Sequence, residues 1–217
     1  MTKLLALTLC STLAFSQFAY AADSDCLPLT AAEGDDLVAL ISGMAADSWL
    51  QIDIDEEQAC TVDRDSLDLD SVTAASYRLS ALLDEFAVQA TVEGYETWLR
   101  VDREFGGELL LNRATGEALD LTAAEFLGDN SQLEASDFFI EYVGTLELAG
   151  ARLRNVETNI PMLDVTYDHY AGRMAEPEVP AGEVAYLTVG SIGEEILEEF
   201  KLVLDISNQL IYMTEAD

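Results

Sequence analysis

An acidic residue stands at the end of a predicted strand, shortly before a pair of glycines. From Thr97 to Asp102 polar and apolar side chains alternate, which is typical of a strand with one buried face. The pair Gly106-Gly107 and the apolar run Leu109–Leu111 follow. A carboxylate in this position can be presented from a rigid scaffold into a cleft, where carboxylate chemistry takes place. The alternative is a hairpin whose turn merely tolerates an aspartate.

Other familiar catalytic and metal-binding patterns are absent from the sequence. His169, the only histidine, has Asp164 and Asp168 nearby, but we expect a solvated loop there. No G-x-S-x-G, H-E-x-x-H or phosphate-binding glycine loop occurs. The acidic run Asp63–Asp70 fails the calcium-loop pattern, because Leu67 stands where an oxygen ligand is required. We therefore expect neither a metal nor a cofactor.

Net charge is the strongest feature of the composition. The chain has 42 acidic and 10 basic residues, a formal charge of −32. Nucleic acid and anionic lipid would repel such a surface, so neither is an expected partner. Half of the residues are apolar, which excludes disorder by composition. A folded core with an acidic coat is typical of proteins from salt-loving bacteria.

The first residues predict export. Lys3 precedes an apolar run, Leu4–Phe18, and Ala19-Tyr20-Ala21 forms an A-x-A cleavage signal, so we expect a signal peptide over residues 1–21. Neither this run, which Ser11, Thr12, Ser16 and Gln17 interrupt, nor any later segment is long and apolar enough to serve as a membrane anchor. The expected location is therefore periplasmic or secreted.

Two cysteines remain after such cleavage. Cys26 and Cys60 form one even pair in an exported chain, which predicts a disulfide. Closing a loop of about 35 residues would stabilise the fold by about 3–4 kcal/mol in the chain-entropy model. We expect residues 22–85 to form a small disulfide-bonded extension of mixed structure.

The remaining pattern predicts mainly β structure. A helix should follow the capping box Thr30–Glu33 and continue to Met44, another should cover much of Val72–Phe86, and a short one Glu194–Phe200. Hairpin turns are expected at Ala149-Gly150 and Ser207-Asn208. Strands are predicted at Trp49–Ile54, Val88–Val92, Thr97–Val101, Leu109–Leu111, Phe138–Leu148, Arg152–Met162, Ala185–Val189, Lys201–Ile206 and Gln209–Met213. Many short strands with one late helix favour a β-barrel or sandwich.

Three blocks of sequence, in this order, resemble the retropepsin-like aspartic peptidases. Val88–Asp102 resembles the opening hairpin that ends in the catalytic aspartate, and Phe105–Leu111 resembles the residues that follow it. Gly144–Val156 is similar to the middle hairpin of the family. Ile192–Asp205 is similar to the closing helix and strand. The resemblance implies a closed retropepsin-like β-barrel over residues 86–217 with one short C-terminal helix, preceded by the mixed extension.

The resemblance breaks at the catalytic triplet. The family carries Asp-Thr-Gly, whereas this chain carries Asp102-Arg103-Glu104. The family mechanism pairs two such aspartates, which share one proton and activate a water. Arg103 cannot replace a buried hydroxyl, and Glu104 adds a side chain where glycine allows close approach. With no second triplet in the chain, an active enzyme would be a homodimer that uses Asp102 twice.

Three functions are therefore open. The first is an exported retropepsin-fold protein with impaired catalysis that serves as a binding or structural module, for instance for a peptide or protein ligand. The second is an active homodimeric aspartic endopeptidase with Asp102 as the catalytic carboxylate. The third is an unrelated secreted β-barrel that binds a small ligand in a closed apolar cavity.

Overall fold

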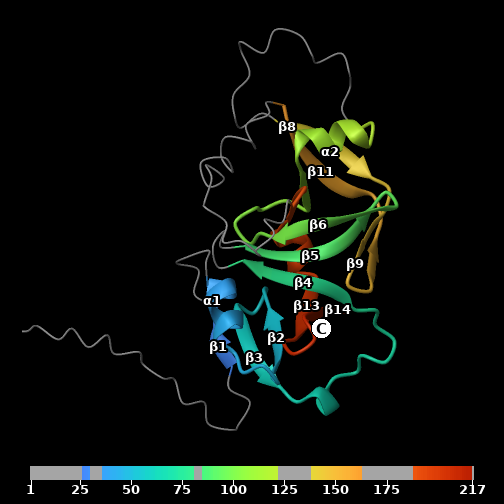
Figure 1. Ribbon diagram of the computed structural model, residues 1–217. Coiled ribbons are helices and arrows are strands. Elements are labelled where there is room, and N and C mark those ends of the chain that lie inside the picture. The colour runs from blue at the N-terminus through green and yellow to red at the C-terminus, as the bar shows by residue number, and fades with distance from the viewer. Residues whose placement is uncertain (1–25, 30–35, 81–84, 122–137, 163–187, 217) are drawn as a thin grey trace, which may run out of the picture.

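The computed structural model describes residues 26–29, 36–80, 85–121, 138–162 and 188–216. It is mainly β, with short helices at the margins of the sheet (Figure 1). This confirms the fold class expected from the sequence. No helix within those ranges is both long and apolar enough to cross a bilayer.

The N-terminal part is a three-stranded unit with one helix. It comprises β1 (Cys26–Pro28), α1 (Asp36–Gly43), β2 (Trp49–Asp53) and β3 (Gln58–Val62), followed by a 3₁₀ turn, η1 (Arg64–Ser66). Cys26 and Cys60 are directly opposite each other in the β1–β3 ladder and form the predicted disulfide. The predicted helix is confirmed over Asp36–Gly43, whereas its capping box lies outside the described residues.

The rest of the chain adds eleven described strands and two described helices. They are β4 (Ala75–Ser80), β5 (Glu85–Val92), β6 (Tyr95–Val101), β7 (Leu109–Leu111), α2 (Arg113–Ala118), β8 (Phe138–Val143), β9 (Leu146–Leu148), β10 (Ala151–Leu153), β11 (Val156–Pro161), β12 (Gly190–Ile192), α4 (Glu194–Leu197), β13 (Phe200–Asp205) and β14 (Leu210–Glu215). Both predicted hairpin turns are confirmed, between β9 and β10 and between β13 and β14.

The helix expected over Val72–Phe86 is wrong. The segment forms β4 and the start of β5, and Tyr77 pairs with Val88 across their ladder. The ring of Tyr77 meets that of Phe86 edge to face, with 5.7 Å between their centroids. The apolar residues of Val72–Phe86 fit the period of a strand as well as that of a helix. The pairing of β4 with β5 decides in favour of the strand.

The closed barrel is also wrong for the described strands, whose order is open. It runs β1-β3-β2-β13-β14-β4-β5-β6-β12-β7-β11-β8, and β9 adds to β5 and carries β10. The outer edge of β13 is occupied by β2, so the sheet extends into the N-terminal segment instead of closing on itself. Ladders β2–β13 and β14–β4 thus pair strands of the expected extension, residues 22–85, with strands of residues 86–217. The expected domain boundary after residue 85 stays a prediction.

The two faces of the sheet differ in the side chains that they carry around Arg100. Leu99, Ile192 and Leu109 are fully buried on the core face. On the opposite face, Arg78, Ala87, Arg100 and Ser191 lie in one row across β4, β5, β6 and β12. The strand register therefore sets Arg100 on the face away from Leu99, between the buried residues Ala87 and Ser191.

Candidate functional site

The loop from Asp102 to Glu108, here called the Asp102 loop, is held by a strand from the far end of the chain. Strand β12 lies between β6 and β7, parallel to β6 and antiparallel to β7. The N–H of Asp102 donates to the carbonyl of Ile192 at 3.0 Å, and the N–H of Gly193 donates to the carbonyl of Glu108 at 2.9 Å. The N–H of Glu194, at the start of α4, donates to Phe105 at 2.8 Å.

Gly193 makes this close contact sterically feasible. A Cβ at this position would lie 1.9 Å from the carbonyl oxygen of Gly107 and 2.6 Å from that of Phe105. Backbone atoms cannot move aside as the end of a side chain can, so only glycine fits. The close approach of the Asp102 loop thus explains why a glycine follows Ile192.

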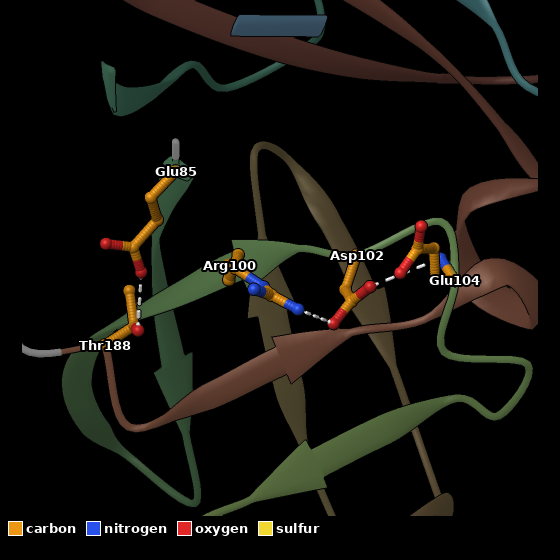
Figure 2. Close-up of polar contacts among 5 residues, drawn as sticks. All are labelled: Glu85, Arg100, Asp102, Glu104 and Thr188. Atoms are coloured by element: carbon orange, nitrogen blue, oxygen red, sulfur yellow. Dashed lines mark hydrogen bonds and ion pairs between the residues drawn. The ribbon is translucent and has the colours of Figure 1, made fainter. Parts of the chain in front are cut away.

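Arg100 neutralises the carboxylate of Asp102. Nη2 of Arg100 donates to Oδ2 of Asp102 in an ion pair, and the backbone N–H of Glu104 donates to Oδ1 at 3.2 Å (Figure 2). The Asp102 side chain is 11% exposed and that of Arg100 is 24% exposed. Both carboxylate oxygens therefore accept hydrogen bonds in a largely water-excluded setting.

Arg103 and Glu104, the two altered residues of the triplet, differ in exposure and in their contacts. Arg103 is half-buried, and its Nε is buried without a hydrogen-bond partner. Glu104 is exposed, and its backbone N–H contacts Asp102. The sequence drew attention to Arg103, whereas the cation on Asp102 comes from Arg100. Their spacing of two on one strand, which places both side chains on one face, was the available signal.

A second buried acid lies on the neighbouring strand. Glu85, at the start of β5, is 8% exposed and accepts a hydrogen bond at 2.7 Å from the hydroxyl of Thr188. In Figure 2 this pair lies apart from the ion pair of Arg100 and Asp102. The sequence did not indicate Glu85 as a site residue, because it was assigned to the expected helix.

A third buried acid, Asp205, ends β13. Its Oδ1 accepts from the Ser207 hydroxyl at 2.7 Å and from the Asn208 N–H at 3.1 Å, and its Oδ2 accepts from the Asn208 amide at 2.7 Å. Burial raises the pKa of Asp205, but the hydrogen bonds from Asn208 and Ser207 outweigh it and hold the pKa below its usual value. Burial, and then the charge of Asp205, raise the pKa of Tyr77 to about 12.

Two cavities among the described residues do not include Asp102. One of about 510 Å³ opens where β4 separates from β5 and β9 takes its place. Glu96, Glu147 and Arg152 line it together with alanines, threonines and other small or apolar residues. Another, of about 320 Å³, is lined by Arg78, whose guanidinium lies 3.9 Å from the ring centroid of Trp98. Neither is the apolar, acid-free cavity that the small-ligand hypothesis requires.

The described side chains give no arrangement for a metal. Among them, no group of three or more His, Cys, Asp and Glu residues could hold an ion. His169, Asp164 and Asp168 lie outside the described residues.

Comparison with known proteins gives distant structural likeness. No protein-family model matches the sequence, and neither does any curated protein. A retropepsin-like aspartic protease from Rickettsia conorii is similar over 67% of this chain and 94% of its own, with 13% identity and a TM-score of 0.37. Basic 7S globulin from soybean is similar over 84% of this chain, with 11% identity and a TM-score of 0.42, and the chain spans about half of its length, 54%.

Proposed function

We propose that this chain is an exported protein of retropepsin-like fold that has lost peptidase activity and serves as a binding or structural module. The observation that carries the proposal is the ion pair between Arg100 and Asp102. It occupies the one carboxylate that the sequence offers for aspartic-peptidase chemistry.

The chemistry of a shared proton explains why this ion pair matters. A dyad of aspartates works with one carboxyl protonated and one ionised. In each copy the guanidinium of Arg100 already bonds to one oxygen of Asp102, and the N–H of Glu104 bonds to the other. In a homodimer each of the two carboxylates would already have a cation. Sharing a proton would then no longer be needed to relieve the repulsion between them.

The order of elements around Asp102 supports the retropepsin-like part of the proposal. The hairpin β5–β6 ends at Asp102, and the hairpin β9–β10 follows later in the chain. The segment after Ile192-Gly193 forms α4, β13, a turn and β14, which is the closing order that the resemblance implies. The helix also bonds to the Asp102 loop through Glu194.

Export is supported by two independent features of the chain. The disulfide between Cys26 and Cys60 suits an oxidising compartment. The A-x-A signal at Ala19-Tyr20-Ala21 agrees with it.

Cleavage of an unfolded protein substrate tests the proposal. The purified mature chain would be assayed over about pH 3 to 7 at high salt, with and without pepstatin, because both aspartic-peptidase chemistry and the acidic surface favour those conditions. We expect no cleavage above that of an Asp102→Asn variant. Asp120→Asn, an exposed position at the end of α2, serves as the matched control.

One outcome would overturn the proposal, and another would strengthen it. Pepstatin-sensitive cleavage that Asp102→Asn lacks and Asp120→Asn retains would show an active homodimeric endopeptidase. Activity that appears in Arg100→Gln alone would instead show that the ion pair is the element that silences a competent site.

A further inference from the structure

The two cavities described above adjoin each other where β5 exchanges one neighbouring strand for another. Strand β4 pairs with the first half of β5, up to Val88, and β9 pairs with the second half, from Ala90 onward (Figure 1). The larger cavity lies at this fork, and the smaller one lies beside it over β4, β5 and β6. Gln89 lines both cavities, and the consecutive residues Ala75 and Ser76 line one each. Gln89 is therefore the point at which the cavities meet.

Polar side chains form a row across the larger cavity. Thr91 of β5 is opposite Glu96 of β6 on one side and opposite Glu147 of β9 on the other. Arg152 of β10 is opposite Glu147 and extends the row. Directly opposed residues carry their side chains on the same face, with Cβ atoms about 5 Å apart. Gln89, two residues before Thr91 on β5, lies on this face as well.

These side chains have hydrogen-bonding capacity for a ligand. Among the described residues, Glu96 has no hydrogen-bond or ion-pair partner. Nε of Arg152 lies 3.4 Å from Oε1 of Glu147, a contact that uses only part of the five N–H groups of a guanidinium. In the smaller cavity, Nδ2 of Asn208 donates to Asp205 at 2.7 Å, which holds the amide in place and leaves its oxygen to accept.

Backbone contacts fix the wall of the larger cavity. The N–H of Met213 on β14 donates to the carbonyl of Ala149 at 3.1 Å, which holds the β9–β10 turn against the sheet. Gly150 lies so close to Thr73 that a Cβ would be 2.8 Å from the carbonyl oxygen of Thr73. The cavity is therefore preformed. Both volumes, about 510 Å³ and about 320 Å³, fall within the range of about 300–1,000 Å³ that is typical of small-molecule sites.

The two cavities differ in charge, and this difference selects the ligand. Two carboxylates and one guanidinium line the larger cavity. Among the described residues that line the smaller cavity none is acidic, and its polar lining comprises Ser76, Arg78, Gln89, Asn208 and Gln209. An extended cation would be favoured in the larger cavity and opposed in the smaller one. Hydroxyl groups donate to carboxylates and accept from guanidinium and amide N–H groups, so a neutral ligand with many hydroxyls suits both.

We propose that the two cavities form one binding site for a neutral oligosaccharide, whose consecutive sugar units occupy them on either side of Gln89. Sugar hydroxyls donate to Glu96 and Glu147 in the larger cavity. Other hydroxyls accept from Arg152 and from the amides of the smaller cavity. The inference rests on the binding role proposed above and gives it a site and a ligand class. Its test does not involve Asp102, so the two proposals fail separately.

An array of immobilised neutral glycans tests the proposal with the purified mature chain. We expect saturable binding of at least one linear glycan. Calorimetry with its soluble form should give an affinity that changes less than about twofold between low and high salt, because no net charge is neutralised on binding. The backbone amide signals of Ala75, Ala90 and Gln209 should shift in nuclear magnetic resonance spectra of the complex. Absence of binding to every glycan on the array would overturn the proposal.

Surface variants locate the site. Gln89→Ala removes the amide that both cavities share and should weaken binding about tenfold, the loss expected for one or two hydrogen bonds. Glu96→Gln keeps the size of the side chain but removes a charged acceptor, and should weaken binding about threefold or more. Gln51→Ala is the matched control for Gln89, since Gln51 is also half-buried on a strand but lines neither cavity, and should bind as the wild type does.

Two further outcomes would overturn the proposal. Equal weakening by Gln89→Ala and Gln51→Ala would show that the glycan binds elsewhere. Spermidine serves as a cationic probe of the same surface. If it binds more tightly than any neutral glycan, with an affinity that falls as salt rises and that Glu96→Gln abolishes, the larger cavity is a cation site instead.

Discussion

Asp102 and Asp205 are both largely buried aspartates at the carboxyl end of a strand, but they are satisfied in different ways. Asp205 accepts from neutral donors within three residues, in the turn between β13 and β14. Asp102 accepts from one cation, Arg100, and from the N–H of Glu104, and its loop is positioned by β12 from about ninety residues further along the chain. The loop of Asp102 therefore depends on the tertiary fold, whereas the turn of Asp205 is largely local.

The comparison explains why one acid was a candidate for chemistry and the other was not. An aspartate whose hairpin turn supplies its donors, as at Asp205, is fixed by its own local sequence. An aspartate in a long-range loop can be given a different partner by a single change at a neighbouring position. Arg100 is such a partner, and the next experiments examine how much each acid depends on its surroundings.

The largest effect is expected from filling the close contact under the Asp102 loop. Gly193→Ala would place a Cβ 1.9 Å from the Gly107 carbonyl and should destabilise the protein by about 3 kcal/mol, since the backbone must shift. Denaturant unfolding measures the loss. Gly106→Ala in the same loop is the control, because its Cβ would meet no atom within 4 Å, and it should change stability little. Equal effects from both would contradict a long-range anchor at Gly193.

A double-mutant cycle measures how strongly Asp102 depends on Arg100. Arg100→Gln leaves a largely buried carboxylate without its cation and should cost about 2 kcal/mol, less than for a fully buried pair because Arg100 is 24% exposed. In the double variant with Asp102→Asn, part of the loss should return, with a coupling energy of about 1 kcal/mol. Unfolding of all four proteins at pH 7 supplies the cycle. Strictly additive losses would show that the ion pair contributes nothing.

How far the sequence predicts the structure depends on the range of the interactions. The Ser207-Asn208 turn and the β9–β10 hairpin were predicted because their residues satisfy one another locally. The expected strands Phe138–Leu148 and Arg152–Met162 are each divided in two by a turn. In the second, Asn155 has a φ of +56°, a conformation that asparagine tolerates better than most residues.

Elements fixed by distant pairing were missed. Strand β12 has three residues and begins with Gly190, so its own propensity is weak, and it exists because β6 and β7 enclose it. Strand β4 was taken for a helix because its pairing with β5 and β14 cannot be deduced from spacing. The partner of Asp102 is a different case. The spacing of two between Arg100 and Asp102 was a local signal, but the interpretation of the sequence followed Arg103 instead.

Removing one neutral donor tests the local satisfaction of Asp205. Asn208→Ala deletes the amide that donates at 2.7 Å and should cost about 1 kcal/mol at pH 7, with a rise in the pKa of Asp205. The pKa of Asp205 in the folded state lies below its ordinary value of 3.8. Its stabilising contribution is therefore complete above that value and is lost as the pH falls through the folded pKa.

Unfolding measured from about pH 5 to 2 should show this loss in the wild type. The dependence should be shallower in Asp205→Asn, which has no carboxyl to protonate. Identical pH dependences below pH 4 would contradict the assignment.

The smallest effect is expected at Tyr77, whose pKa is raised mainly by burial and only secondarily by the charge of Asp205. The pKa of Tyr77 is raised to about 12 by burial first and by Asp205 second, so Asp205→Asn should lower it but leave it above 10. Because the folded-state pKa is the higher one, the stabilisation from the neutral phenol is complete below 10.0 and is lost as the pH rises through about 12. Ultraviolet titration of phenolate measures the pKa of Tyr77 in the wild type and in Asp205→Asn. The titration step at high pH that is missing in Tyr77→Phe identifies this tyrosine. A late step that Asp205→Asn leaves unmoved would show that burial alone holds the proton on Tyr77, and that the charge of Asp205 is screened by the donors of its own turn.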